Sequence, residues 1–126
     1  EDDVLLCLPE TGKVQRIYRA NSRYNSILLT ERCDQLCVMC SQPPRRTYDK
    51  WRFPLFKEAF DLIPEDGRVV ISGGEPTVYK EELFDILNHT ATNRPDVSFQ
   101  ILSNCQHFTE QDIDRIVTKR HVHYLF

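Results

Sequence analysis

Residues 68–76 have the sequence RVVISGGEP, which joins a strand to a sharp turn. Residues 68–72 are rich in β-branched side chains, as expected for a strand that is buried on both faces. Two glycines and a proline follow directly and end the strand. Apolar residues recur at helical spacing before this stretch, over residues 54–63, and after it, over residues 80–90. We therefore expect a buried strand between two helices.

The same alternation continues in both directions. Residues 26–30 form a short apolar run before the first helix, and a strand over residues 97–102 follows the second. Thr109 and Asp112 resemble a capping box that opens a third helix, and residues 121–126 are expected to form a fourth strand. Strands that alternate with helices require right-handed crossovers and a parallel sheet. The sequence therefore predicts an α/β fold.

The first residues predict a β-hairpin. Apolar runs at residues 4–8 and 14–18 flank the turn sequence PETG. We divide the chain into a hairpin extension, residues 1–25, and an α/β core, residues 26–126. The chain lacks an initial Met and stops on its last strand. We expect a fragment truncated after the fourth strand, the N-terminal half of a longer βα barrel.

Composition is that of a globular domain. The 126 residues are 40% hydrophobic and 28% charged, with a net charge of -3. This charge gives no basic surface for nucleic acid, and no apolar run is long enough to cross a bilayer. We expect a cytoplasmic protein with no nucleic-acid or membrane partner. Three of the five cysteines lie within eight residues, which favours a shared metal over disulfides.

Those three residues, Cys33, Cys37 and Cys40, have the spacing C-x3-C-x2-C. A closed iron–sulfur or structural zinc site usually has four protein ligands, so three thiolates imply one metal position that is open to another ligand. Cys7 and Cys105 are more simply explained as small buried or loop residues. The alternative is a zinc site completed by a distant residue: Cys105, His89 or His107.

Polar or glycine-rich groups follow the next two strands. Gly73 and Gly74 allow a tight turn and close approach to a ligand, and the carboxylate of Glu75 can accept hydrogen bonds from an amine. Ser103 and Asn104 carry groups suited to a ribose or carboxylate. Each set also fits a simple turn. Because ligands bind at the carboxyl ends of parallel strands, we expect these residues and the cysteines to meet at one edge.

This arrangement resembles the radical S-adenosylmethionine (SAM) superfamily, which has C-x3-C-x2-C after the first strand of a partial (βα)6 barrel and a GGEP-type sequence after the second. The resemblance implies that Cys33, Cys37 and Cys40 hold a 4Fe-4S cluster whose fourth iron binds SAM. It implies that the turn at residues 73–75 contacts the amino group of SAM. Ser103 and Asn104 match more loosely the residues that contact its ribose or carboxylate.

The residue before the last cysteine is often aromatic in that superfamily and packs near the adenine. Here it is Met39, whose thioether can make the same apolar contact. The implied activity is reductive cleavage of SAM to a 5'-deoxyadenosyl radical, which then removes hydrogen from a substrate. The later strands that help bind adenine and substrate in the family are absent from this chain, so we expect the fragment to depend on them for activity.

Residues 29–44 look like the radical SAM maturases of His-Xaa-Ser peptide-modification systems. This resemblance implies a small ribosomally made precursor peptide as substrate and a second radical SAM protein as partner. The reaction also needs a reducing electron carrier of the flavodoxin or ferredoxin type. The basic residues nearby form either a docking surface for such a carrier or peptide, or a solvated loop: Arg45, Arg46, Lys50 and Arg52.

Two other functions remain open from the residues alone. One is a zinc-stapled binding module, in which the cysteines only stabilise their loop. The other is a cluster-bearing electron-transfer domain that never cleaves SAM. A bound metal other than iron favours the zinc-stapled module. A cluster whose spectrum does not change when SAM is added favours the electron-transfer domain.

Overall fold

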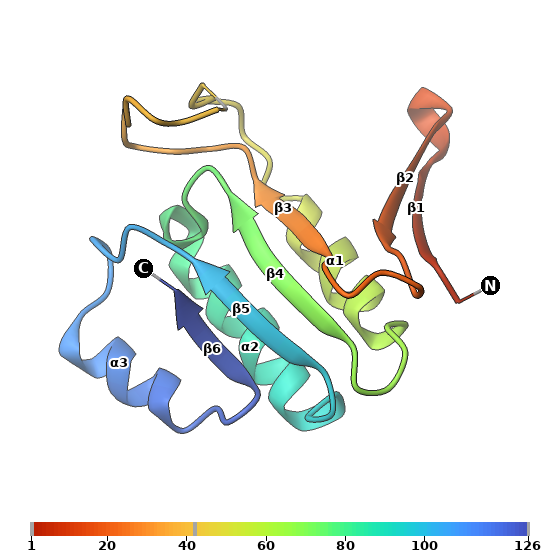
Figure 1. The fold of residues 1–126 in the computed structure, drawn as a ribbon. Coiled ribbons are helices and arrows are strands. Elements are labelled where there is room, and N and C mark those ends of the chain that lie inside the picture. Colours follow the sequence, from red (N-terminus) through yellow and green to blue (C-terminus); the bar gives the residue numbers. More distant parts are fainter. Residues whose placement is uncertain (1, 42, 126) are drawn as a thin grey trace.

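The computed structural model describes residues 2–41 and 43–125. Strands and helices alternate along most of the chain (Figure 1). The strands are β1 (Val4–Leu8), β2 (Lys13–Tyr18), β3 (Ser26–Thr30), β4 (Arg68–Gly73), β5 (Ser98–Leu102) and β6 (Val122–Leu125). The helices are α1 (Arg52–Asp61), α2 (Lys80–Asn93) and α3 (Glu110–Val117), with short 3-10 helices η1 (Pro9–Thr11) and η2 (Pro76–Tyr79).

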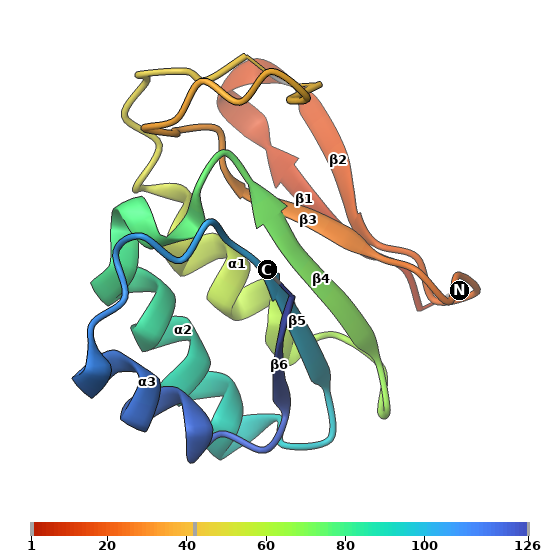
Figure 2. The same cartoon turned by 60° about the vertical axis from the view of Figure 1, so that its left-hand side comes forward.

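Within the described residues, β3, β4, β5 and β6 form a four-stranded parallel sheet in that order, which confirms the predicted α/β fold. Strands that neighbour each other in the chain are also neighbours in the sheet. Figure 2 shows α1, α2 and α3 on the same side of this sheet, as right-handed crossovers between adjacent strands require. One face of the sheet is therefore covered by helices.

The core lies between this covered face and the helices. Alternate strand residues such as Val69, Ile71, Phe99 and Ile101 are fully or almost fully buried there. Phe60 of α1 packs on Phe99 with ring centroids 5.1 Å apart. The intervening residues point to the other face, where the side chains are partly or fully exposed.

The predicted hairpin is confirmed: β1 pairs antiparallel with β2, and Gly12 ends the connecting turn in the left-handed conformation. Val4, Ile17 and Tyr18 belong to the same hydrophobic core as the parallel sheet. The division at residue 25 stays a prediction.

Element boundaries differ slightly from those expected. Helix α1 begins at Arg52 rather than Pro54, because a proline is tolerated anywhere in the first turn, where no intrahelical N–H bond is lost. Helix α3 has the predicted cap: the Asp112 amide donates to Thr109 Oγ1, and the Thr109 amide donates to Asp112 Oδ2. The last expected strand, residues 121–126, is observed as β6, and residue 126 lies outside the described residues.

Candidate functional site

A pocket of about 220 Å³ lies at the carboxyl ends of β3, β4 and β5. All the predicted site residues except Met39 line it. The lining consists of Cys33, Gln35, Cys37, Cys40, Pro44, Ser72, Gly73, Gly74, Glu75, Leu102, Ser103 and Asn104. A larger, open hollow at the amino ends of β3 and β4 contains none of these groups. The predicted meeting of three strand ends is thus observed.

Two glycines bring the end of β4 against the chain that leads to Cys33. Gly73 has φ of +140°, and a Cβ there would collide with the backbone of Thr30. A Cβ on Gly74 would lie 2.5 Å from the carbonyl carbon of Arg32 and closer still to its oxygen. The sequence suggested that these glycines approach a ligand. The structure shows that they first allow close contact between two protein segments.

Backbone hydrogen bonds seal this contact. The Gly74 amide donates to the Thr30 carbonyl oxygen and the Glu75 amide to the Arg32 carbonyl oxygen, both at 2.8 Å. The residue before Cys33 is therefore fixed directly by the turn after β4. This places the first cysteine beside the glycine turn.

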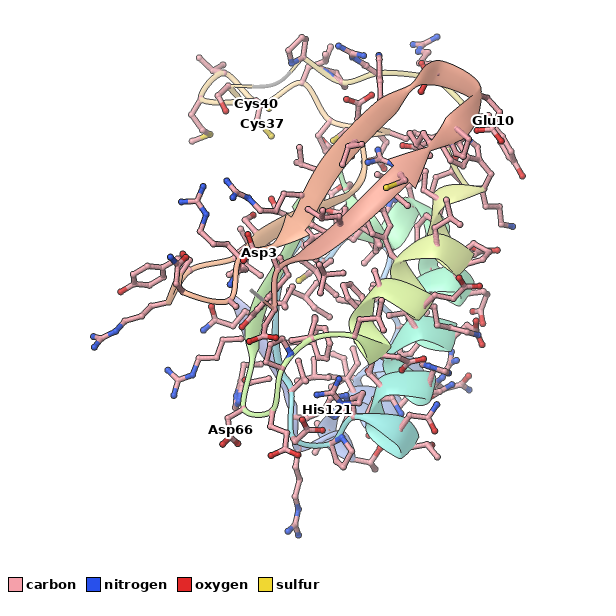
Figure 3. All side chains as sticks on the ribbon, turned by 90° about the vertical axis from the view of Figure 1, so that its right-hand side faces the viewer. Asp3, Glu10, Cys37, Cys40, Asp66 and His121 are labelled. Carbon is pink, nitrogen blue, oxygen red and sulfur yellow. The ribbon has the colours of Figure 1, made fainter. Side chains whose placement is uncertain are left out.

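The cysteine loop, residues 31–51, is closed at its base. Asp49 accepts hydrogen bonds from the Thr30 hydroxyl at 2.8 Å and from the Glu31 amide at 2.7 Å. The Arg45 amide donates to the Glu31 carbonyl oxygen at 3.2 Å. The loop thus leaves β3 and returns to the same point. Its far part carries Cys37 and Cys40, and Figure 3 shows both at the end of the molecule opposite Asp66 and His121.

A second set of contacts ties the cysteine loop to the loop after β5. The side chain of Gln35 donates to that of Gln106 at 2.8 Å, and the imidazole of His107 lies 2.6 Å from Asp34. The backbone N–H of Gln35 donates to the sulfur of Cys33 at 3.5 Å. Sequence reasoning missed these residues, because nothing in their spacing marks them.

Glu75 is almost completely buried, with 2% of its surface exposed. Its Oε1 accepts hydrogen bonds from the Thr77 amide at 2.9 Å and from the Ser103 hydroxyl at 2.8 Å, and its Oε2 accepts from the Asn104 amide at 2.8 Å. The carboxylate therefore joins the end of β4 to the end of β5. The side chains of Ser103 and Asn104 also accept from the amides of Cys105 and Gln106.

Met39 is not among the residues that line this pocket. It is 90% exposed, and the neighbouring apolar residues Leu36 and Val38 are exposed as well. Its expected contact with adenine stays a prediction. Two residues of the basic group form ion pairs: Arg45 with Glu31 at 3.3 Å, and Lys50 with Glu82.

In residues 2–41 and 43–125, no three His, Cys, Asp or Glu side chains lie close enough together to hold one metal ion. His89 and His107, the alternative zinc ligands, lie within hydrogen-bond distance of Asp61 and Asp34. The three cysteines share a pocket without converging on one point. A four-iron cluster binds each thiolate to a different iron, so its ligands need not meet at one point, and three thiols at one pocket are the type of donor that it requires.

The helices of the described segments are too short or too polar to cross a membrane. Comparison with family models, curated proteins and solved structures gave no match to this chain.

Proposed function

We propose that this chain is part of a radical SAM enzyme, in which Cys33, Cys37 and Cys40 hold a 4Fe-4S cluster that binds and reductively cleaves SAM. The observation that carries the proposal is the pocket at the strand ends. It combines three thiols, a glycine turn and a buried carboxylate. A structural metal site with four protein ligands needs neither the glycine turn nor the buried carboxylate.

The topology supports the barrel that this function implies. Parallel strands in consecutive order, with α1, α2 and α3 on one side, are the repeating unit of a βα barrel, whereas a doubly wound sheet has helices on both faces. Val70, Ser72, Gln100 and His123 lie on the uncovered face and are partly or fully exposed. We infer that β3 to β6 are the first four strands of a partial (βα)6 barrel and that this face lines its interior.

Cys33, Cys37 and Cys40 would hold the cluster, which would supply the one-electron chemistry for reductive cleavage of SAM. The protein residues bind and orient the reactants. The Asn104 amide occupies one side of Glu75 Oε2, and a carboxylate oxygen has a second lone pair for the amino group of SAM. Gly73 and Gly74 line the same pocket as the three cysteines.

The further partners follow from the sequence resemblance. We propose a ribosomally made precursor peptide as substrate, a flavodoxin or ferredoxin as electron donor and a second radical SAM protein as partner, all in the cytoplasm. The ion pairs of Arg45 and Lys50 reduce the positive charge available to attract an acidic carrier. They favour the interpretation of this basic group as a solvated loop.

The test is anaerobic reconstitution of the full chain with iron and sulfide, followed by metal analysis and equilibrium dialysis against labelled SAM. The expected product holds about four irons per chain and retains SAM. Cys37→Ala should lose both. Cys7→Ala is the matched control, because Cys7 is an exposed cysteine in β1, outside the pocket, and it should keep both.

Two results would contradict the proposal. A colourless protein that binds zinc and not iron would make this a structural metal domain. A cluster-loaded protein whose cluster spectrum does not change when SAM is added in excess would make it an electron-transfer domain.

A further inference from the structure

Asp49 is an acidic residue buried at the base of the cysteine loop. Its exposed fraction is 6%, and both carboxylate oxygens accept hydrogen bonds from the end of β3. Oδ1 faces the hydroxyl of Thr30, a residue with no exposed surface, and Oδ2 faces the amide of Glu31. Burial of a carboxylate is costly unless donors surround it, so this contact is a specific one.

A series of hydrogen bonds links Asp49 to Arg32, the residue before Cys33. The Thr30 hydroxyl donates its hydrogen to Asp49, which leaves the lone pairs of its oxygen free to accept. It accepts a hydrogen bond from the backbone amide of Arg32 at 3.0 Å. The Arg32 carbonyl oxygen in turn accepts from the Glu75 amide. The two residues before Cys33 are thus held on one side by Asp49 and Thr30, and on the other by the turn after β4.

We propose that Asp49 is a positioning residue for Cys33, which orders the start of the cysteine loop before any metal binds. The metal-binding part of this inference depends on the proposed function. Asp49 lies nine residues after Cys40 and does not line the pocket, so it acts through the backbone of residues 30–32. A loop ordered in advance loses less conformational entropy when its cysteines bind the cluster.

The first readout is hydrogen exchange of single backbone amides in the metal-free chain, measured by NMR. Asp49→Asn replaces one acceptor oxygen with an NH₂ group that cannot accept from Thr30 or Glu31. We expect exchange at the Glu31 and Arg32 amides to rise about tenfold or more relative to amides of β5, as for loss of a hydrogen bond to a charged group. Normalising to β5 separates this local effect from general destabilisation.

Three further variants make the readout specific. Thr30→Val removes the hydroxyl at nearly constant shape and should speed exchange at the Arg32 amide, whereas Thr30→Ser keeps the hydroxyl and should not. Asp112→Asn is the matched control, because Asp112 is another buried, hydrogen-bonded carboxylate that belongs to the cap of α3. It should leave exchange at Glu31 and Arg32 unchanged. Native-like exchange at both amides in the Asp49→Asn variant would overturn the proposal.

The second readout is the rate of iron loss to a chelator after reconstitution. We expect Asp49→Asn to lose iron several times faster than the native chain and Asp112→Asn to lose it at the native rate. Equal rates in all three proteins would overturn the positioning role and leave the proposed function standing. A native chain that takes up no iron would overturn the proposed function and, with it, the role of Asp49 in metal binding.

Discussion

Gly74→Ala is expected to damage both the fold and the cysteine site. A Cβ at this position meets the backbone of Arg32 at 2.5 Å and closer, and the Cβ of Cys33 at 3.0 Å. Real Cβ atoms essentially never come within 3.0 Å of a heavy atom outside their own residue and its two chain neighbours. A backbone cannot swing aside as the end of a long side chain does, so β4 and the cysteine loop must move apart.

The cost has two parts. Forcing extra volume into a packed site costs about 1–3 kcal/mol. Separating the segments also weakens the hydrogen bonds from the amides of Gly74 and Glu75 to the β3 end, each with a net value of about 1 kcal/mol. If both hydrogen bonds are lost, we expect the free energy of unfolding to fall by about 3–5 kcal/mol, a large share of the usual total of about 5–15 kcal/mol.

Gly12→Ala provides a matched control. Gly12 has a positive φ of 63°, and a Cβ there meets no atom within 4 Å. We expect the free energy of unfolding to fall by only about 1 kcal/mol, the cost of holding an alanine in the left-handed conformation. Urea unfolding followed by circular dichroism measures both variants. A Gly74→Ala chain as stable as Gly12→Ala, with undiminished iron uptake, would refute the close packing of the glycine turn on the cysteine loop.

Three other variants test groups around the site and core. Glu75→Gln should destabilise the chain by about 2 kcal/mol, because one acceptor oxygen that faces donors such as the Ser103 hydroxyl becomes an NH₂ group; an unchanged urea midpoint would contradict this. Hydrogen bonds from Lys80 and then Thr109 lower the pKa of Asp112 in the folded chain. The ionised Asp112 therefore stabilises the fold above its unfolded pKa of 3.8, and this stabilisation is lost as pH falls below that value. The stability difference between the native chain and Asp112→Asn should therefore shrink below about pH 4, and a difference that grows with acid would contradict this. Burial lowers the pKa of His121, so protonation destabilises the fold as pH falls below the unfolded pKa of 6.5. The free energy of unfolding should therefore depend less on pH between about pH 7 and 5 in His121→Gln than in the native chain. An equal pH dependence in the two proteins would contradict this.

The sequence predicted the order of strands and helices because local patterns determine it. β-branched runs such as residues 68–72 and the cap at Thr109 indicate elements without any tertiary information. The meeting of Cys33, Gly74 and Asn104 also followed from sequence, since parallel strands bring their carboxyl ends to one edge.

The supporting contacts were not predictable. Asp49 meets Thr30 across 19 residues, and Gln35 meets Gln106 across 71, and neither pair has a local signature. Glu75 was identified as an acceptor, but two of its observed partners, Ser103 and Asn104, depend on the register of β4 and β5. Side-chain contacts of this kind arise only when the folded backbone brings distant segments together.

The most direct test of the central claim is electron paramagnetic resonance of the reconstituted, reduced chain with and without SAM. We expect a four-iron signal that shifts when SAM is added, is lost in Cys37→Ala and persists in Cys7→Ala. A signal that SAM leaves unchanged, or the absence of any iron signal, would contradict an open iron held by Cys33, Cys37 and Cys40.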